Sequence, residues 1–264
     1  FCFVKVRIDD QFRLNEDGGD IIIGFGAECL YCAECQHNRN LFRDRIKDVA
    51  AMPTRVQMYL YNRRSGFLRM RLATWNINSV RLRINLVLDF LTRHDIDVLC
   101  LQETKTEDQH FPADALAEAG WAEQAFRGEK SYNGVAIISR LPLSGASHMN
   151  WAGREDCRHI SAEIATGPGA QTVRVHNFYV PAGGDVPDRQ ENQKFGHKLD
   201  FIAEMTAYFS QNKPERSILV GDLNIAPLAE DVWSTKQLKN VVSHTDIERE
   251  GLLRLIDDGG WSDV

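Results

Sequence analysis

The sequence predicts an α/β fold in which mixed β-sheets form a layered sandwich. From Leu72 onward, apolar segments of strand-like composition alternate with amphipathic segments whose apolar residues recur at helical spacing. Continuous apolar runs, such as 97–103 (DVLCLQE) and 217–222 (SILVGD), are typical of buried strands. The chain has 264 residues, which is long enough to bury a sizeable core.

The predicted elements follow one another along this part of the chain. The first strand is 72–77 (LATWNI), and a helix follows at about 82–94, with Ser79 as its N-cap residue. A long helix is predicted at about 191–209, and a last helix begins in 248–256 (EREGLLRLI). The remaining predicted strands are 97–103 (DVLCLQE), 133–139 (NGVAIIS), 159–164 (HISAEI), 172–180 (TVRVHNFYV) and 217–222 (SILVGD).

The chain divides at about residue 70 into two segments of different character. Residues 1–69 show weaker order, and we interpret them as an N-terminal extension of foreign or upstream sequence, with Met70 as the natural translation start. Residues 70–264 form the predicted α/β domain.

A cysteine cluster lies in the N-terminal extension. Cys29, Cys32 and Cys35 form a C-x2-C-x2-C pattern with His37 close behind, which is compatible with a zinc or iron–sulfur site. The position where an iron–sulfur run would place its fourth cysteine is Arg39, and no distant second ligand pair is visible. We therefore favour free thiols over a metal site.

Composition and charge exclude several classes of protein. No apolar run approaches the roughly 20 residues needed to cross a bilayer, and the start lacks the order of a secretory signal, so we expect a cytoplasmic protein without a membrane partner. The net charge of −6 argues against a surface coated in basic residues. A polyanion would therefore be held by a few placed cations or by metal ions.

Polar side chains stand at the ends of four predicted strands. These residues are Asn76, Glu103, Tyr179, and the pair Asp222 and Asn224. Strand ends along one edge of a sheet are where α/β folds gather ligand groups, and this set suits a hard divalent cation together with a phosphate ester. Each residue alone is explained by a turn, a surface ion pair or a core aromatic. Only their joint occurrence favours a metal and phosphate site.

Five motifs carry a resemblance to a known family. The segments TWNINSVRLR, DVLCLQETK, NGVAIIS, NFYVPAGGD and VGDLNIAP occur in the order and approximate spacing of the exonuclease III group of apurinic/apyrimidinic endonucleases. This group belongs to the endonuclease/exonuclease/phosphatase superfamily. The resemblance implies a four-layer α/β sandwich of two packed mixed β-sheets flanked by helices. It also implies a metal-dependent phosphodiesterase that acts on DNA, with Mg²⁺ as cofactor and Mn²⁺ as an alternative.

The resemblance also implies roles for the strand-end residues. Asn76 and Glu103 are similar to the amide and carboxylate of the family's metal site, and Tyr179 to the tyrosine near the scissile phosphate. Asp222 resembles the aspartate that orients the water or protonates the leaving group, and Asn224 the amide that steadies the phosphate. Asp222 and Asn224 are also counted among the metal-site residues.

Three cations near these motifs are candidates for DNA contact. Arg81 follows the first motif, Lys105 follows Glu103, and Arg158 matches a position that is commonly basic in the family. The alternative for each is a solvated surface charge. As partners we expect duplex DNA with abasic sites or 3′ ends, bound by a monomer.

The family pattern continues beyond Val264. The terminal SDH motif, with the general-base histidine, is not in the sequence, and His176 and His244 stand in contexts that do not replace it. We therefore expect a C-terminally incomplete domain that lacks the last strands. Two alternatives to a repair nuclease follow: a catalytically dead fragment, and a same-fold phosphoesterase that acts on a small phosphate ester.

Overall fold

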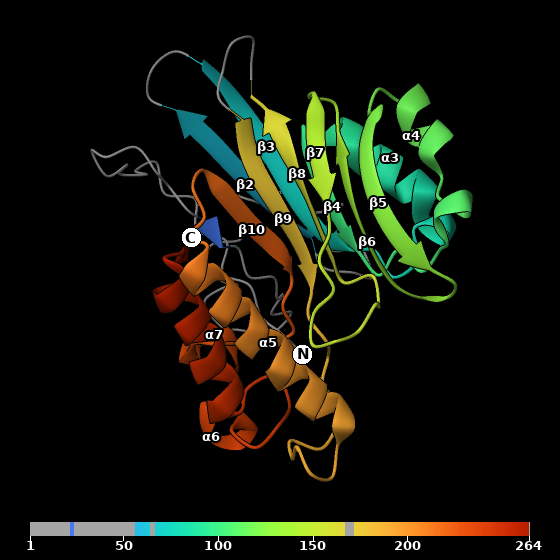
Figure 1. Cartoon of the computed structure of the whole chain (residues 1–264). Helices are drawn as coiled ribbons and strands as arrows, with labels where there is room; N and C mark the ends of the chain where they lie inside the picture. Colours follow the sequence, from blue (N-terminus) through green and yellow to red (C-terminus); the bar gives the residue numbers. More distant parts are fainter. Residues whose placement is uncertain (1–21, 24–55, 64–66, 167–171, 264) are drawn as a thin grey trace.

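The computed structural model describes residues 22–23, 56–63, 67–166 and 172–263. Two β-sheets pack face to face, and helices cover their outer faces, which gives four layers (Figure 1). Both sheets contain parallel and antiparallel pairs. The predicted four-layer α/β sandwich of two mixed sheets is thereby confirmed. In the part of the chain that the structure describes, no helix combines the length and apolar character that a membrane span requires.

One sheet has the strand order β2-β3-β4-β6-β5. Its strands are β2 (Val56–Arg63), β3 (Phe67–Asn76), β4 (Val98–Gln102), β5 (Glu123–Glu129) and β6 (Tyr132–Ser139). Only β3 and β4 run parallel to each other. The helices α3 (Ile84–Arg93) and α4 (Ala113–Glu118) lie beside this sheet, at the right of Figure 1. Short 3₁₀ turns, η1 (Arg81–Arg83) and η2 (Asp108–His110), precede them.

The other sheet has the strand order β11-β1-β10-β9-β8-β7. Its strands are β1 (Ile22–Ile23), β7 (Leu143–Ser147), β8 (His159–Ala165), β9 (Thr172–Tyr179), β10 (Ser217–Asp222) and β11 (Ser262–Asp263). The strands β9 and β10 run parallel, whereas β8 is antiparallel to both of its neighbours. The helices α5 (Gln193–Gln211) and α7 (Asp246–Gly259) lie side by side against it, with η3 (Ala229–Asp231) and α6 (Thr235–Leu238) between them in sequence.

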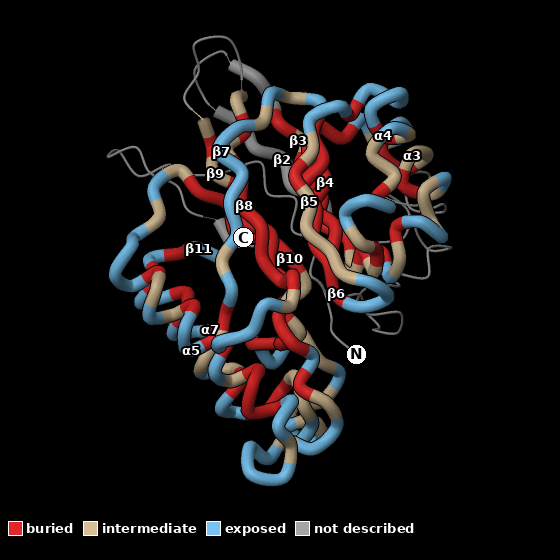
Figure 2. The backbone as a smooth tube through the Cα atoms, turned by 45° about the vertical axis from the view of Figure 1, so that its right-hand side comes forward, coloured by how far each residue is buried: buried red, intermediate tan, exposed pale blue. Residues whose placement is uncertain are grey.

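The core consists of three apolar clusters, one at each junction between layers. The central cluster joins the two sheets, with Val98 and Ile137 from one sheet and Val175 and Val220 from the other. The outer clusters join each sheet to its helices, and buried positions line the central strands β4, β6, β8, β9 and β10 in Figure 2. Burial on both faces explains why the central strands are continuous apolar runs.

Several elements differ from their sequence-based prediction. The helix predicted at 82–94 is divided into η1 and α3, and its N-cap residue is Arg83 instead of Ser79. Ser79 has a φ of 85° and lies in the loop after β3. The prediction omitted the strands β1, β2, β5, β7 and β11 and the helices α4 and α6. The edge strand β7 is mostly exposed, so it lacks the apolar run that marks a buried strand.

The expected boundary at residue 70 falls inside β3, which begins at Phe67. The backbone of β2 pairs with β3, so this sheet starts within the segment assigned to the N-terminal extension. The division into an extension at 1–69 and a domain at 70–264 stays a prediction. The cysteine cluster at 29–37 lies outside the described residues.

Candidate active site

The carboxyl ends of two parallel strand pairs meet across the sandwich. In one sheet Asn76, at the end of β3, is level with Gln102 at the end of β4. In the other sheet Tyr179, at the end of β9, is level with Asp222 at the end of β10. Hydrogen bonds between these two pairs of strand ends define the candidate site.

Four of the predicted site residues form one hydrogen-bonded cluster. The Nδ2 atom of Asn76 donates to Glu103 Oε1 and to Asp222 Oδ2, each at 2.8 Å. The hydroxyl of Tyr179 donates to the same Glu103 oxygen at 2.8 Å. The amide of Asn76 therefore bridges the two carboxylates, and Tyr179 closes the cluster from the other sheet.

Asn224 steadies the loop that follows β10. Its backbone N–H donates to Asp222 Oδ1 at 3.2 Å, and its Nδ2 donates to the carbonyl oxygen of Val180 at 2.9 Å. Its own carbonyl oxygen accepts from Lys198 Nζ at 2.7 Å. Asn224 thus connects the ends of β9 and β10, next to Asp222 and Tyr179.

The backbone at the site is bent sharply. Glu103, Lys105 and Asn224 have φ values of 52°, 51° and 52°, in the left-handed region that residues with a Cβ atom rarely adopt. The loops after β3 and β4 hold this conformation through backbone bonds, among them Ser79 N–H to Glu103 O at 2.7 Å. Strain of about 1–3 kcal/mol per residue persists only where the surroundings impose it, and such residues cluster at functional sites.

The cluster sets the protonation of its members. Burial raises the pKa of Glu103, but hydrogen bonds from Asn76, Lys105 and Tyr179 lower it by more, so the pKa lies below its usual value. The pKa of Tyr179 is raised by burial and by the charge of Glu103 and its hydrogen bond with that carboxylate. At neutral pH the site therefore presents an ionised Glu103 and a protonated Tyr179 that donates a hydrogen bond.

The three predicted DNA contacts lie in different surroundings. Lys105 Nζ is 2.7 Å from Glu103 Oε2 and donates to Asn78 Oδ1 at 2.6 Å. Arg158 is buried beside the ring of Tyr179. Arg81 is exposed in η1. The DNA contact of each stays a prediction, but Lys105 and Arg158 are already engaged by the residues of the site.

Two buried polar pairs support the site and were not identified in the sequence. Gln102 Nε2 donates to Asn177 Oδ1 at 2.6 Å, and this pair joins the two sheets just below Glu103 and Tyr179. Lys198 on α5 pairs with Glu248 on α7, with 2.5 Å between Nζ and Oε1. An amide within an apolar strand, next to a predicted site residue, is the signal that could have identified Gln102 and Asn177.

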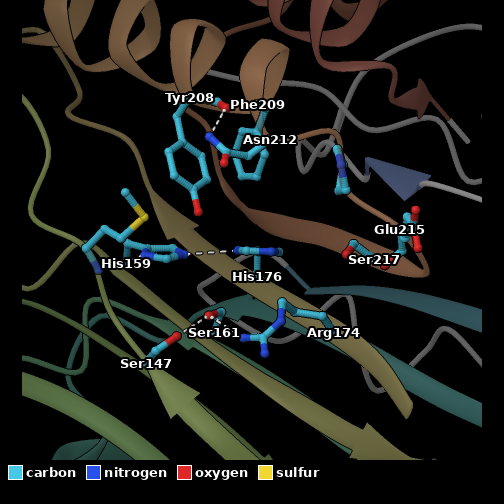
Figure 3. A pocket seen from close by; sticks show the side chains of 12 residues that line it. Ser147, His159, Ser161, Arg174, His176, Tyr208, Phe209, Asn212, Glu215 and Ser217 are labelled. Carbon is cyan, nitrogen blue, oxygen red and sulfur yellow. Dashed lines mark hydrogen bonds between the residues drawn. The ribbon is translucent and has the colours of Figure 1, made fainter. Parts of the chain in front are cut away.

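A cavity of about 250 Å³ lies between α5 and the outer face of the sheet that contains β9, away from the candidate site (Figure 3). His159 and His176 line it, and their ring nitrogens Nε2 and Nδ1 are 3.2 Å apart. Both histidines are buried. The predicted site residues do not line this cavity.

The donor atoms at the strand ends fit a hard cation. Glu103 and Asp222 supply carboxylate oxygens, and Asn76 and Asn78 supply amide oxygens. Among the residues whose side chains the structure describes, no group of three or more His, Cys, Asp or Glu side chains is placed to hold a metal ion. An ion with one or two carboxylate ligands that completes its shell with water and phosphate oxygens, as Mg²⁺ does, suits this arrangement.

The cluster at the strand ends is typical of an enzyme that hydrolyses phosphodiesters, and comparison with known proteins supports this class. The model of the endonuclease/exonuclease/phosphatase family matches residues 73–261, so the chain belongs to this family. Its members are metal-dependent nucleases.

Curated relatives specify the group within the family. The chain is 28% identical over 201 residues to an exodeoxyribonuclease of Bacillus subtilis, and this alignment covers 72% of this chain and 72% of the relative. It is 29% identical over 167 residues to exodeoxyribonuclease III of Haemophilus influenzae, covering 62% of this chain and 60% of the relative. It is also 29% identical over 199 residues to the DNA repair nuclease APEX1 of Danio rerio, covering 72% of this chain and 60% of the relative.

Solved structures agree with these relatives. An AP endonuclease from Archaeoglobus fulgidus is 31% identical, with a TM-score of 0.64, over 71% of this chain and 70% of that chain. The 3′ phosphatase NExo from Neisseria, bound to a product DNA hairpin, is 29% identical, with a TM-score of 0.63, over 72% of this chain and 71% of that chain. The resemblance inferred from the five motifs is thereby confirmed.

Proposed function

We propose that this protein is a DNA-repair nuclease that hydrolyses phosphodiesters at abasic sites and at 3′ ends of duplex DNA. The observation that supports this most is the hydrogen-bonded cluster of Asn76, Glu103, Tyr179 and Asp222 at the facing strand ends. The relatives include an exodeoxyribonuclease III, an AP endonuclease and a 3′ phosphatase bound to DNA. The proposed cofactor is Mg²⁺, with Mn²⁺ as a substitute.

Each residue of the cluster would have a distinct role in binding the ion or the phosphate. Glu103, with the amide oxygen of Asn76, would hold the ion, which supplies charge to stabilise the phosphoryl oxygens when it is bound. Tyr179 stays protonated, and its hydroxyl, which donates to Glu103 in the structure, would turn toward the developing negative charge when substrate is bound. Asp222 orients the attacking water or protonates the leaving group, and Asn224 holds Asp222 and the phosphate in place.

Nicking of a synthetic duplex that carries one abasic analogue tests this proposal, with Mg²⁺ or with EDTA. We expect incision on the 5′ side of the analogue that requires the metal. Glu103→Gln should reduce kcat by about 10²–10³-fold, because it removes the charge that holds the ion. Glu118→Gln, at an exposed position on α4, is the matched control and should leave incision unchanged.

Three results would count against the proposal. Unchanged incision by Glu103→Gln would refute the site assignment. Hydrolysis of a small phosphate ester without DNA incision would favour a phosphoesterase with the same fold. The absence of both DNA incision and ester hydrolysis would favour a catalytically dead fragment. The monomeric state belongs to the proposal and is measured by light scattering, whereas the cytoplasmic location stays a prediction.

A further inference from the structure

Arg158 is enclosed by the protein instead of being presented to solvent. It precedes β8, directly across from Tyr179 on β9, and its side chain is 7% exposed. A cation that contacts DNA phosphates needs an accessible guanidinium group. Burial at this level points to an intramolecular role.

The contacts of Arg158 centre on Tyr179. The guanidinium carbon lies 4.7 Å from the centroid of the Tyr179 ring, which is the geometry of a cation–π interaction. One terminal nitrogen donates to the carbonyl oxygen of Tyr179 at 3.2 Å, and the backbone N–H of Tyr179 donates to the carbonyl oxygen of Arg158 at 2.8 Å. Arg158 therefore contacts both the ring and the backbone of Tyr179.

A carboxylate holds Arg158 in this position, and a histidine lies nearby. The Nε atom of Arg158 donates to Asp156 Oδ2 at 2.6 Å, and His197 Nε2, from α5, is 3.5 Å from the same oxygen. Burial raises the pKa of Asp156, but His197 and Arg158 lower it by more, so Asp156 is ionised at neutral pH. His197 is buried, and its Nε2 has no hydrogen-bond partner among the described residues.

These contacts form a continuous chain from the loop before β8 to the metal-site carboxylate: Asp156, Arg158, Tyr179 and Glu103. We propose that Arg158 is a positioning residue that fixes the Tyr179 ring, and with it the hydroxyl that donates to Glu103, and that Asp156 holds Arg158 for this purpose. This inference rests on the proposed function for its kinetic consequences. It replaces the prediction that Arg158 contacts DNA.

Kinetics distinguish a positioning residue from a DNA contact. Arg158→Met should lower kcat for abasic-site incision by about 10- to 30-fold, the effect of losing one desolvated cation–π contact, while KM and its dependence on salt stay unchanged. Arg158→Lys should lose less, because it keeps the charge but not the planar fork. Arg154→Met, at an exposed arginine in the same loop, is the matched control and should match the wild type.

A double-mutant cycle tests whether Arg158 acts through Tyr179. If it does, adding Arg158→Met to Tyr179→Phe should cause little further loss of kcat, because the hydroxyl that Arg158 positions is already absent. Asp156→Asn should reproduce part of the Arg158→Met effect. Additive losses in kcat would show that Arg158 acts independently of Tyr179, and a raised KM with a salt slope reduced by about 1 would show that it contacts DNA. Either result would overturn the inference.

A spectroscopic measurement makes the test independent of activity. The chain has six tyrosines, so 3-fluorotyrosine labelling gives few ¹⁹F resonances, and Tyr179→Phe identifies the one from Tyr179. Arg158→Met should shift this resonance and Arg154→Met should not. An unmoved resonance would overturn the inference. If the wild type failed to incise DNA, the proposed function would fall, yet the resonance would still decide whether Arg158 positions Tyr179.

Discussion

At the scale of single residues, the site depends on the balance of charge around Glu103. Its carboxylate is partly buried, which favours the neutral form, but it accepts bonds from Asn76 and Tyr179 and pairs with Lys105. Those partners favour the ionised form and outweigh burial. Because a metal ion binds the ionised carboxylate, the lowered pKa would keep Glu103 available to a metal ion at lower pH.

Tyr179→Phe tests this balance directly. Removing the hydroxyl that bonds to Oε1 should raise the pKa of Glu103, since that donor stabilises the charged form. The acid limb of the pH–rate profile should move to higher pH, and kcat should fall by about 10²-fold with the loss of one donor at the site. The pKa is measured by ¹³C titration of the labelled carboxyl in metal-free protein.

Tyr208→Phe, on α5, is the control for this experiment. Tyr208 lines the cavity between α5 and the sheet that contains β9, away from the candidate site. Neither the titration of Glu103 nor the pH–rate profile should therefore change. A Glu103 titration that stays the same in Tyr179→Phe would contradict the assigned hydrogen bond.

The sequence indicated the members of this cluster but not their contacts. Polar residues at strand ends singled out Asn76, Glu103, Tyr179 and Asp222, because strand ends are where α/β folds collect ligand groups. Arg158 is predicted to contact DNA because it matches a position that is commonly basic in the family, and its contacts with Tyr179 cannot be inferred from the sequence. The Tyr179 ring is 21 positions away along the chain, and the contact exists only because β8 and β9 are antiparallel.

At the scale of elements, a buried ion pair fixes the helices that cover the site. Lys198 on α5 and Glu248 on α7 are fully buried, and Lys198 also donates to the carbonyl oxygens of Ala182 and Asn224 in the loops after β9 and β10. Glu248 is also the N3 residue of the capping box with Thr245 that starts α7. The pair therefore links both outer helices to the loops that carry the strand-end residues.

Lys198→Met should destabilise the protein by about 3–5 kcal/mol, because it leaves the Glu248 charge buried without its partner. Urea unfolding at neutral pH measures this loss. Lys194→Met, at an exposed position one turn earlier on α5, should change the free energy of unfolding by less than about 0.5 kcal/mol.

The double variant Lys198→Met/Glu248→Gln separates charge from packing. It removes the uncompensated charge and keeps an oxygen that can accept from Ser243 and Thr245, so it should be more stable than Lys198→Met alone. A double variant as unstable as the single one would show that lost packing, not buried charge, dominates. The T-x-x-E pattern of the capping box could be read from the sequence, whereas its pairing with a lysine 50 positions earlier could not.

At the scale of the whole molecule, the three apolar clusters make the sandwich, and a few buried polar groups fix its alignment. Alternating strand and helix patterns were enough to predict the layers, because burial on both faces leaves a clear apolar signal. The alignment of the sheets depends instead on pairs such as Gln102 and Asn177, whose partners lie on different sheets. Composition and periodicity do not reveal which residues form such pairs.

The histidine pair on the outer face of one sheet gives the whole molecule a pH-dependent stability. The backbone N–H of Met149 donates to His159 Nδ1, so His159 carries its proton on Nε2 and donates it to His176 Nδ1 (Figure 3). Burial lowers the pKa of both rings, and the charge of His176 lowers the pKa of His159 further. Arg174 adds to the effect of burial on His176, whose pKa falls to about 3. Protonation of either ring would disrupt this chain of hydrogen bonds.

Because both folded-state pKa values lie below the ordinary value of 6.5, the unfolded chain takes up protons first as the pH falls. The free energy of unfolding should therefore decrease below about pH 6.5, by up to about 1.4 kcal/mol per pH unit for each histidine. Between pH 7.5 and pH 5 this amounts to about 2 kcal/mol per histidine. That window lies above the range in which Glu103 and Asp156, with their lowered pKa values, titrate.

His176→Asn removes one titrating group and keeps an oxygen that can accept from His159. Urea unfolding at pH 7.5 and pH 5 should show the variant losing about half as much stability on acidification as the wild type, because only His159 then takes up a proton on unfolding. His110→Asn, at an exposed histidine, should lose as much as the wild type. An equal pH dependence in His176→Asn and the wild type would mean that His176 is already protonated in the folded protein, or that its pKa is not lowered by burial. In either case the neutral pair would not be the source of the acid sensitivity.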